Sequence, residues 1–301
     1  MDFKYWFLLS RVPFLIVAIL PFCLGALLAG RILGVFSWPV FLLGLLGTVL
    51  VQLIAHYSGE VHDLAEDRLS VRLEKNFFTG GSQVLVENLI PVKNVKRLIR
   101  MVIFLALLIG LALQFYFKCG KLTLGLGFSG ILCAYFYSKP PLRLVRRGVG
   151  EVFIAYAFGW LSVSTGFYLQ AGHFNVLATL ISLPIAYSVT NLILINEYPD
   201  YPADKQASKQ NLLVRVGKAN GALLYAWLVG FSAAAFLLAL FKGLPPLAGM
   251  FYLPVLVISV NAARQMLKGG YGDRSKLERL CAQTIFVNIG TTASCMLGLL
   301  F

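Results

Sequence analysis

The chain has 301 residues, of which 58% are hydrophobic and only 13% are charged. Because soluble domains carry about 25% charged residues, this composition excludes an ordinary soluble protein and predicts a polytopic membrane protein. The formal net charge of +13 arises from 26 Lys and Arg against 13 Asp and Glu. These basic residues are dispersed over short loops, so we expect contact with membrane lipid and no nucleic-acid partner.

Nine apolar segments of helical length follow one another along the chain. Segments of roughly 17–25 residues span a bilayer as helices, and the lack of polar alternation argues against barrel strands. The first segment lacks a small-residue cleavage pattern, so we interpret it as a retained span. We expect an all-α bundle of nine transmembrane helices around a central cavity, near 13–30, 36–57, 98–117, 122–137, 151–171, 175–196, 220–241, 246–264 and 280–301.

The basic residues predict the orientation of this bundle. Only four of the 26 Lys and Arg follow odd-numbered spans, namely Arg31, Lys118, Lys121 and Lys242. Positive residues mark the cytoplasmic side, so we expect an integral protein of the cytoplasmic membrane with its N-terminus and the loops after even-numbered spans inside. All 13 acidic residues lie on that same side or at its membrane edge, which topology does not require.

The first long cytoplasmic connection, 58–96, opens with "SGEVHDLAED". Glu60, Asp63 and Asp67 are spaced i, i+3 and i+7. On a helix that continues out of the second span they share one face. Glu66 points elsewhere on such a helix, and we interpret it as a solvated neighbour.

The second long connection, 197–219, begins with "EYPDYPADKQ". Polar side chains here recur at i, i+4 and i+8, namely Asn196, Asp200 and Asp204. Pro199 and Pro202 each remove a backbone hydrogen bond, so we expect the helix to break near Tyr198 and restart. The distance between the two acidic motifs suggests two four-helix halves, about 1–140 and 141–260, with a ninth helix, inside a single domain 1–301.

Grouped carboxylates predict a divalent metal site. Carboxylates on one face raise one another's pKa values, and burial near hydrocarbon costs each at least about 2.5 kcal/mol. Mg²⁺ removes both penalties and is held by one or two carboxylates with substrate phosphates. Two such clusters opening into one cavity predict two Mg²⁺ ions and a diphosphate. The candidate metal ligands are Glu60, Asp63, Asp67, Asn196, Asp200 and Asp204.

Basic side chains beside the same loops are candidates for neutralising that diphosphate. The plainer alternative is that they are ordinary charges of the cytoplasmic side, which is our interpretation of Arg146, Arg147 and Lys218. A different class of function, a cation transporter, would place carboxylates along a span, and none lies there. The five cysteines have no CxxC spacing and are expected to pack as small apolar residues.

The two motifs together resemble those of the UbiA superfamily of intramembrane prenyltransferases. The family pattern N-D-x-x-D-x-x-x-D corresponds to "GEVHDLAED" (59–67), and D-x-x-x-D corresponds to the end of "NEYPDYPAD" (196–204). Further similar stretches are "KQNLLVRVGK", "FTGGSQVLVENLI", "YSKPPLRLVRRGVGE" and the Phe158–Gly159 pair. This chain departs from the pattern in having Gly59-Glu60 where the family has Asn-Asp, which affects the expected metal shell.

The resemblance implies Mg²⁺-dependent transfer of a polyprenyl group from its diphosphate to an aromatic acceptor, inside a helical bundle open to the cytoplasm and to lipid. It is strongest to the menaquinone-type branch, whose acceptor is 1,4-dihydroxy-2-naphthoate; 4-hydroxybenzoate, a glycerol phosphate lipid or haem remain alternative acceptors. Expected catalytic residues are Asp63, Asp67, Asp200, Asp204, Lys139 and Tyr137. Expected diphosphate contacts are Asn196, Lys139, Arg143, Lys205, Lys209, Arg215 and Ser82.

Overall fold

The computed structural model describes residues 3–34, 36–73 and 81–301, and within them it contains helices and no strand. In chain order the helices are α1 (Phe3–Leu9), η1 (Val12–Leu15), α2 (Ile16–Leu33), α3 (Trp38–His62), α4 (Leu64–Leu73), α5 (Val92–Leu111), η2 (Ala112–Tyr116), α6 (Thr123–Phe136), η3 (Leu144–Arg146), α7 (Gly150–Ile154), η4 (Ala155–Leu161), α8 (Ser162–Ala171), α9 (Val176–Gln206), α10 (Leu212–Val216), α11 (Lys218–Phe241), α12 (Pro246–Leu267), η5 (Gly270–Gly272) and α13 (Arg274–Leu300).

Eight helical segments in this described part are long and apolar enough to cross a membrane, judged by length and composition. They are Phe3–Leu33, Trp38–His62, Val92–Tyr116, Gly150–Ala171, Val176–Gln206, Lys218–Phe241, Pro246–Leu267 and Arg274–Leu300. The remaining expected span corresponds to α6, which is apolar but has only 14 residues. At 1.5 Å per residue α6 is about 21 Å long, shorter than a hydrocarbon core of about 30 Å.

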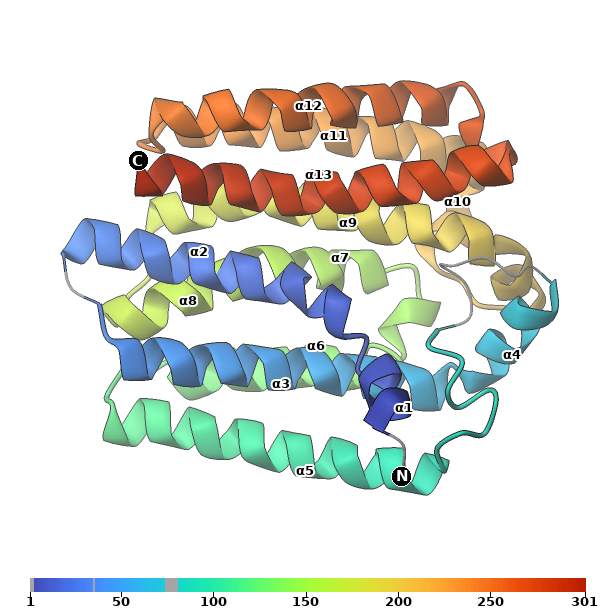
Figure 1. Cartoon of the computed structure of the whole chain (residues 1–301), viewed down its shortest axis with the longest axis horizontal. Helices are drawn as coiled ribbons and strands as arrows, with labels where there is room; N and C mark the ends of the chain where they lie inside the picture. The colour runs from blue at the N-terminus through green and yellow to red at the C-terminus, as the bar shows by residue number, and fades with distance from the viewer. Residues whose placement is uncertain (1–2, 35, 74–80) are drawn as a thin grey trace.

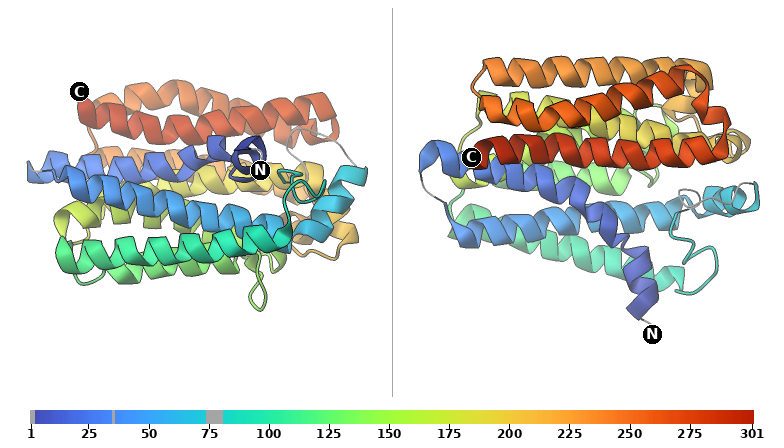
Figure 2. Two further views of the ribbon diagram at one scale, coloured as in Figure 1. Left: turned by 60° about the horizontal axis from the view of Figure 1, so that its bottom comes forward. Right: turned by 45° about the horizontal axis from the view of Figure 1, so that its top comes forward.

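The long helices run side by side, and the connections gather at the two ends of the bundle (Figure 1). Both motif-bearing connections lie at one end, with α4 and α10. The short connections 172–175 and 243–245 lie at the other end. α1 lies in the half of the bundle that carries these connections, whereas α13 ends at the opposite end, and the further views in Figure 2 show the same arrangement. One end of the bundle therefore carries all the predicted chemistry.

Two glycines allow α2 and α8 to pack with their backbones in contact. A Cβ atom built on Gly25 would lie 1.9 Å from the carbonyl oxygen of Val163, and one on Gly166 would lie 2.1 Å from that of Phe22. Only residues without a side chain permit so close a crossing, which is a common way for helices to associate in membranes. This contact fixes the position of α2, whose N-terminal end forms one wall of the pocket described below.

The second motif lies on an unbroken helix, so the break expected near Tyr198 is wrong. α9 runs from Val176 to Gln206 through Pro199 and Pro202. Pro199 has no N–H for the carbonyl of Ile195, and the thiol of Cys281 contacts that oxygen at 3.9 Å. A substitute donor from α13 thus accompanies the interruption, in the way that neighbouring helices make proline tolerable inside membrane helices.

The first motif, in contrast, spans a break that the sequence did not predict. α3 ends at His62 and α4 begins at Leu64, with Asp63 between them. Backbone hydrogen bonds continue across the junction, from Asp63 N–H to the Gly59 carbonyl (2.8 Å) and from Asp67 N–H to the Asp63 carbonyl (2.9 Å). α4 packs against α9, which brings the two motifs together.

Candidate functional site

A pocket of about 760 Å³ extends through the half of the bundle formed by α2, α3, α5, α6, η4, α8 and α9. Its lining residues in the described chain come from positions up to Lys209, so α11–α13 support the pocket without lining it. Most of the wall is apolar. The lining also includes residues of both motifs and the lysine that follows the second, namely Gly59, Glu60, Asp63, Asp67, Asn196, Asp200 and Lys209. The structure therefore brings together motifs more than 130 residues apart in the sequence.

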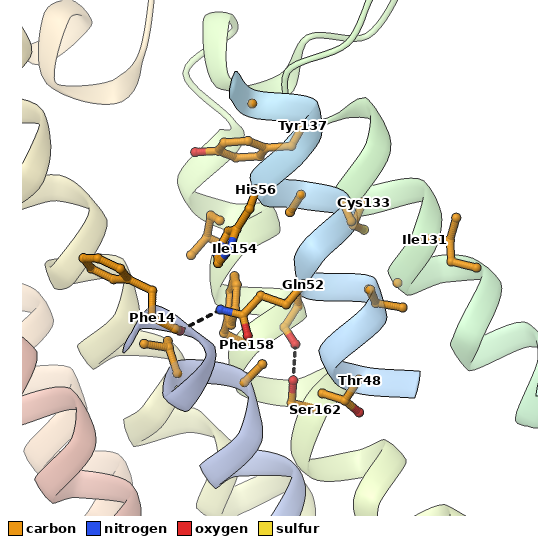
Figure 3. Close-up of a pocket in the computed structure, with 18 of the residues that line it drawn as sticks. Phe14, Thr48, Gln52, His56, Ile131, Cys133, Tyr137, Ile154, Phe158 and Ser162 are labelled. Carbon is orange, nitrogen blue, oxygen red and sulfur yellow. Dashed lines mark hydrogen bonds between the residues drawn. The ribbon is translucent and has the colours of Figure 1, made fainter. Parts of the chain in front are cut away.

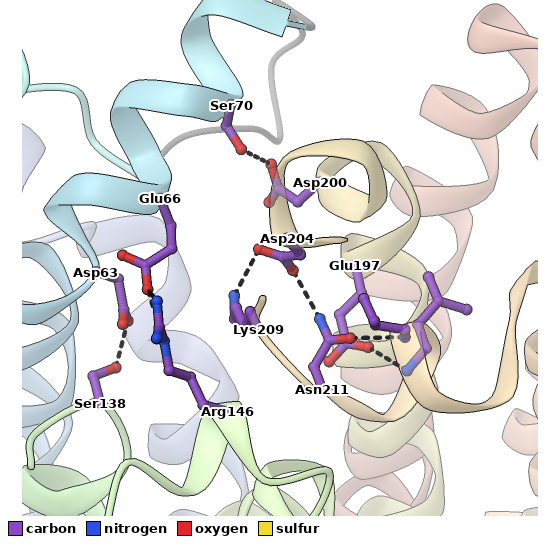
Figure 4. A network of polar contacts seen from close by, with 12 residues as sticks. Asp63, Glu66, Ser70, Ser138, Arg146, Glu197, Asp200, Asp204, Lys209 and Asn211 are labelled. Atoms are coloured by element: carbon purple, nitrogen blue, oxygen red, sulfur yellow. Dashed lines mark hydrogen bonds and ion pairs between the residues drawn. The ribbon is translucent and has the colours of Figure 1, made fainter. Parts of the chain in front are cut away.

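Asp63 and Glu60 have different surroundings, although the sequence gives both the same face. Asp63 Oδ2 accepts a hydrogen bond of 2.5 Å from Ser138 Oγ (Figure 4), while its buried Oδ1 has no hydrogen-bond partner among the residues that the structure describes. Both oxygens of Glu60 accept bonds of 2.7 Å from Ser82, one from its backbone N–H and one from its hydroxyl. Glu60 thus holds the 81–83 segment at the pocket, and Ser82 contacts Glu60.

Gly81 is required by the close approach of this segment to the acidic cluster. Its φ is +63°, and a Cβ atom there would lie 2.8 Å from Asp67 Oδ2 and 3.0 Å from Glu60 Oε1. At Gly59, the departure from the family pattern, a Cβ atom would meet Ser138 and Asp63 only at 3.8 and 3.9 Å. A larger side chain has room to begin there, so crowding does not explain this glycine.

On α9 the three residues of the second motif divide between the pocket and the adjoining loop. Asp200 Oδ1 accepts a 2.7 Å hydrogen bond from Ser70 of α4. Asn196 lines the pocket, and its buried Oδ1 has no hydrogen-bond partner within the described ranges. Asp204 is 2% exposed and does not line the pocket; its oxygens contact Lys209 Nζ (3.1 Å) and Asn211 Nδ2 (2.8 Å).

Lys209 is the one predicted cation that reaches the pocket lining in the described chain. Burial alone would lower its pKa, but the carboxylates of Asp204, Asp63 and Asp200 outweigh that effect and raise the pKa above the usual lysine value. The ammonium group therefore stays charged and partly neutralises the acidic cluster. It also presents a cation beside any phosphate that enters.

The other predicted basic residues lie outside the pocket lining. The Lys139 ammonium lies 4.0 Å from the centre of the Tyr135 ring. Arg143 donates to the carbonyl of His62 at 2.8 Å. Lys205 and Arg215 are exposed on the α9–α10 side, and Arg215 donates to the carbonyl of Gln210 at 2.9 Å.

Glu66 is buried, so its interpretation as a solvated neighbour is wrong. It is 3% exposed, and its Oε1 forms an ion pair with Arg146 and lies 3.7 Å from Arg143. It is not among the residues that line the pocket, but its carboxylate lies close enough to Asp63 to raise the pKa of that residue. The pair ties α4 to the segment after α6, because a buried carboxylate needs such a partner. Arg146 therefore stabilises the fold through this ion pair, in addition to being one of the basic residues expected on the cytoplasmic side.

Two acidic residues that the sequence analysis did not single out hold the loop that carries Lys209. Glu151 accepts the backbone N–H of Leu212 at 3.1 Å, and Glu197 accepts that of Leu213 at 3.2 Å. Both carboxyls are buried. Their position in the sequence could have indicated a role, because each acid lies at a membrane edge inside a stretch that resembles the family.

The acidic cluster predicts how the metal-free protein responds to pH. Burial, with the charges of Glu60 and Asp63, raises the pKa of Asp67 to about 8, and burial raises that of Asp63 to about 6. The folded protein therefore binds more protons than the unfolded chain between pH 4 and 8, and stability falls as pH rises through this window. We expect the Tm in a metal chelator to fall from pH 5 to pH 8 more in the wild type than in Asp67→Asn. Equal or opposite trends would contradict the assignment, and thermal unfolding by circular dichroism measures them.

The oxygen donors at the polar end fit a hard divalent cation. In the described chain no group of three His, Cys, Asp or Glu side chains is arranged as a complete metal site. Mg²⁺ does not need one, since it is bound by one or two carboxylates with waters and phosphate oxygens. The buried, unpartnered oxygens of Asp63 and Asn196 suit this role, and Asp67 and Asp200 line the same part of the pocket.

Comparison with known proteins adds family-level information. The profile of the UbiA prenyltransferase family matches residues 18–286. The chain is 26% identical over 281 residues to a 1,4-dihydroxy-2-naphthoate octaprenyltransferase of Escherichia coli (strain K12), covering 90% of this chain and 89% of that protein. It is 25% identical over 218 residues to a 2-carboxy-1,4-naphthoquinone phytyltransferase of Synechocystis, covering 72% of this chain and 68% of that protein.

Among solved structures, a UbiA homolog from Archaeoglobus fulgidus bound to GPP and Mg²⁺ has a similar fold. The TM-score is 0.62 with 16% sequence identity, and the alignment covers 97% of this chain and 99% of that one. The similarity therefore extends over nearly the whole helical bundle.

Proposed function

The chain belongs to the UbiA prenyltransferase family, and from this membership we propose that it transfers a polyprenyl group from its diphosphate to a 1,4-dihydroxy-2-naphthoate-type acceptor, a quinone precursor. The observation that carries the proposal is the pocket, whose polar end is lined by both acidic motifs and whose remainder is apolar. The acceptor class rests on relatives named for dihydroxynaphthoate or carboxynaphthoquinone substrates.

The diphosphate of the donor binds at the polar end. Asp63, Asp67, Asp200 and Asn196 are the residues that would hold two Mg²⁺ ions there, and these ions would supply Lewis-acid stabilisation of the departing pyrophosphate. The ammonium group of Lys209 can contact the phosphate oxygens, because it lies close to the carboxylates of the acidic motifs and stays charged there. Asp204 holds that lysine in place by accepting a hydrogen bond from its ammonium group, and Asn211 in turn donates to the other oxygen of Asp204.

The apolar part of the pocket accommodates the isoprenoid. Phe128 and Leu107 line it and are also 56% and 38% exposed on the surface of α6 and α5. A long chain can leave between these helices toward lipid, and we take α6 as the ninth, short span of the bundle. Keeping water away from the reacting carbon is the main task of these walls.

Transfer then proceeds by cleavage of the bond between C1 of the isoprenoid and the diphosphate oxygen, which keeps the electron pair. The resulting allylic cation is shielded by aromatic faces, of which Tyr137 lies at the pocket wall close to the motifs. An electron-rich ring carbon of the acceptor supplies the electron pair of the new bond to C1. The same carbon then loses its proton, or its carboxyl group as CO2, and the electron pair of the broken bond stays in the ring and restores aromaticity. We expect the polar end to face the cytoplasm, following the distribution of basic residues.

Incubation of the purified protein with isoprenoid diphosphates of several lengths and a panel of acceptors tests this function. The panel contains 1,4-dihydroxy-2-naphthoate, 4-hydroxybenzoate, a glycerol phosphate lipid and haem. We expect prenylated naphthoate and one equivalent of pyrophosphate, both dependent on Mg²⁺. Preferential alkylation of another acceptor, or no transfer to any, would overturn the assignment.

A further inference from the structure

One turn and two turns before the first motif, α3 presents two polar side chains to the pocket. Gln52 and His56 lie one helical turn apart on the same side of α3, and His56 is the one nearer to Tyr137 (Figure 3). Polar groups inside an otherwise apolar span are costly and are retained for function. The diphosphate chemistry described above uses neither of them.

The side-chain oxygen of Gln52 has no hydrogen-bond donor beside it in the described chain. Its side-chain nitrogen donates to the carbonyl oxygen of Phe14 at 2.7 Å. Because a carbonyl oxygen only accepts, this contact identifies the nitrogen and leaves the amide oxygen on the other side. The residue is 4% exposed, and that buried oxygen has no partner in the described chain. A ligand that donates a hydrogen bond would satisfy it.

His56 is fixed in the corresponding way. Its Nδ1 lies 2.8 Å from the carbonyl oxygen of Ser10, so Nδ1 must carry the hydrogen. In the neutral ring Nε2 is then an acceptor. Both side chains are therefore anchored by carbonyl groups of the segment that joins α1 to α2, and both present an acceptor to the pocket.

We propose that Gln52 Oε1 and His56 Nε2 bind the two ring hydroxyl groups of the aromatic acceptor, an inference that rests on the proposed function. Side chains four residues apart on a helix are separated by roughly 5–6 Å at their Cβ atoms, which is about the separation of two hydroxyls in para positions of one ring. Phe14, Ile154 and Phe158 line the pocket beside them and supply apolar surface for the ring faces.

The position of Gln52 and His56 suits the binding of the aromatic substrate better than that of the diphosphate or the isoprenoid tail. His56 precedes Asp63 by seven residues, or about 10 Å along the helix axis, which leaves room for the allylic carbon between the diphosphate and the ring. An isoprenoid tail offers no hydrogen-bond donor, so it would leave both acceptors unsatisfied. This pair therefore selects para-dihydroxy aromatics over acceptors with a single hydroxyl group.

Equilibrium binding to the purified, detergent-solubilised protein tests the inference separately from catalysis. Kd is measured under anaerobic, reducing conditions for 1,4-dihydroxy-2-naphthoate and for 1-hydroxy-2-naphthoate, which lacks one hydroxyl. In the wild type we expect the dihydroxy compound to bind about 10- to 100-fold more tightly, because the analogue leaves a buried acceptor unpaired. Of Gln52→Met and His56→Phe, the variant that removes the partner of the 4-hydroxyl group should bring the ratio of the two Kd values close to one. The other variant should raise both Kd values by a similar factor.

Thr48→Val is the matched control, because Thr48 lies one turn further along the same wall and its hydroxyl already donates to the Gly44 carbonyl at 3.0 Å. The ratio should stay at its wild-type value in this variant. Binding of an isoprenoid diphosphate analogue with Mg²⁺ should be the same in all variants. A ratio near one in the wild type, which requires no folded variant, overturns the inference even if prenyl transfer is intact. Absence of transfer with a preserved ratio overturns the proposed function alone.

Discussion

Asp63→Asn and Asp200→Asn are each expected to lower kcat/KM for prenyl transfer on the order of 10²–10³-fold or more. Both carboxylates line the polar end of the pocket, and asparagine keeps their size while removing the charge that a metal–diphosphate complex requires. Asn at position 200 still accepts from Ser70, so local packing is preserved. Steady-state assays with varied donor and Mg²⁺ measure the loss.

These variants are also expected to stay folded. Removing one negative charge from a buried group of like charges relieves repulsion, so the metal-free Tm should equal or exceed that of the wild type, a common trade between stability and activity. Stabilisation by Mg²⁺ with an isoprenoid diphosphate analogue should disappear. Glu278→Gln is the control, because that carboxylate is exposed on α13 and pairs only at the surface with Arg274. Wild-type Mg²⁺-dependent transfer by either active-site variant would refute the proposed roles.

Gly25→Ala and Gly166→Ala are expected to lower the free energy of unfolding by about 3 kcal/mol or more, which corresponds to a drop in Tm of several degrees. Each added methyl group would meet backbone atoms of the facing helix at about 2 Å. Backbone cannot rotate away as a side chain can, so α2 and α8 must separate. Thermal unfolding in detergent measures the effect.

Gly230→Ala provides the comparison for these two variants. Gly230 lies inside α11, and apart from the backbone of its own helix no atom of the described chain lies within 4 Å of a Cβ built there. Alanine favours a helix over glycine by about 1 kcal/mol, so this variant should be neutral or slightly more stable. Similar Tm values for Gly25→Ala and Gly230→Ala would show that the close crossing does not limit stability.

The spans and the motif positions were predictable because they depend on local patterns. Apolar runs predicted nine spans, and eight of them correspond to helices long and apolar enough to cross a membrane; in the described part of the chain the ninth corresponds to the shorter α6. The spacing of Asn196, Asp200 and Asp204 predicted one helical face, but only the first two of these residues line the pocket. The expected break at Pro199 was wrong because a thiol on α13, 82 residues after Pro199, lies against the carbonyl that proline leaves without a partner.

Spacing alone did not reveal which acids face a ligand. Glu60 and Asp63 share a predicted face, yet the first is bound by Ser82 and the second keeps an unpartnered oxygen. Glu66 pairs with Arg146, and Asp204 pairs with Lys209. Each difference is made by a residue from another segment, whose proximity only the folded chain establishes.

The amino-acid sequence by itself determined the class of protein, the two acidic motifs and their family resemblance, because hydropathy and helical spacing are properties of neighbouring residues. The tertiary structure decided which charged groups pair with one another and which line the pocket. It also revealed the pair Gln52 and His56 on the pocket wall. The physical reason is that a buried polar atom is defined by its partners. Those partners come from helices distant in the chain, so their presence or absence can be read only after the helices pack.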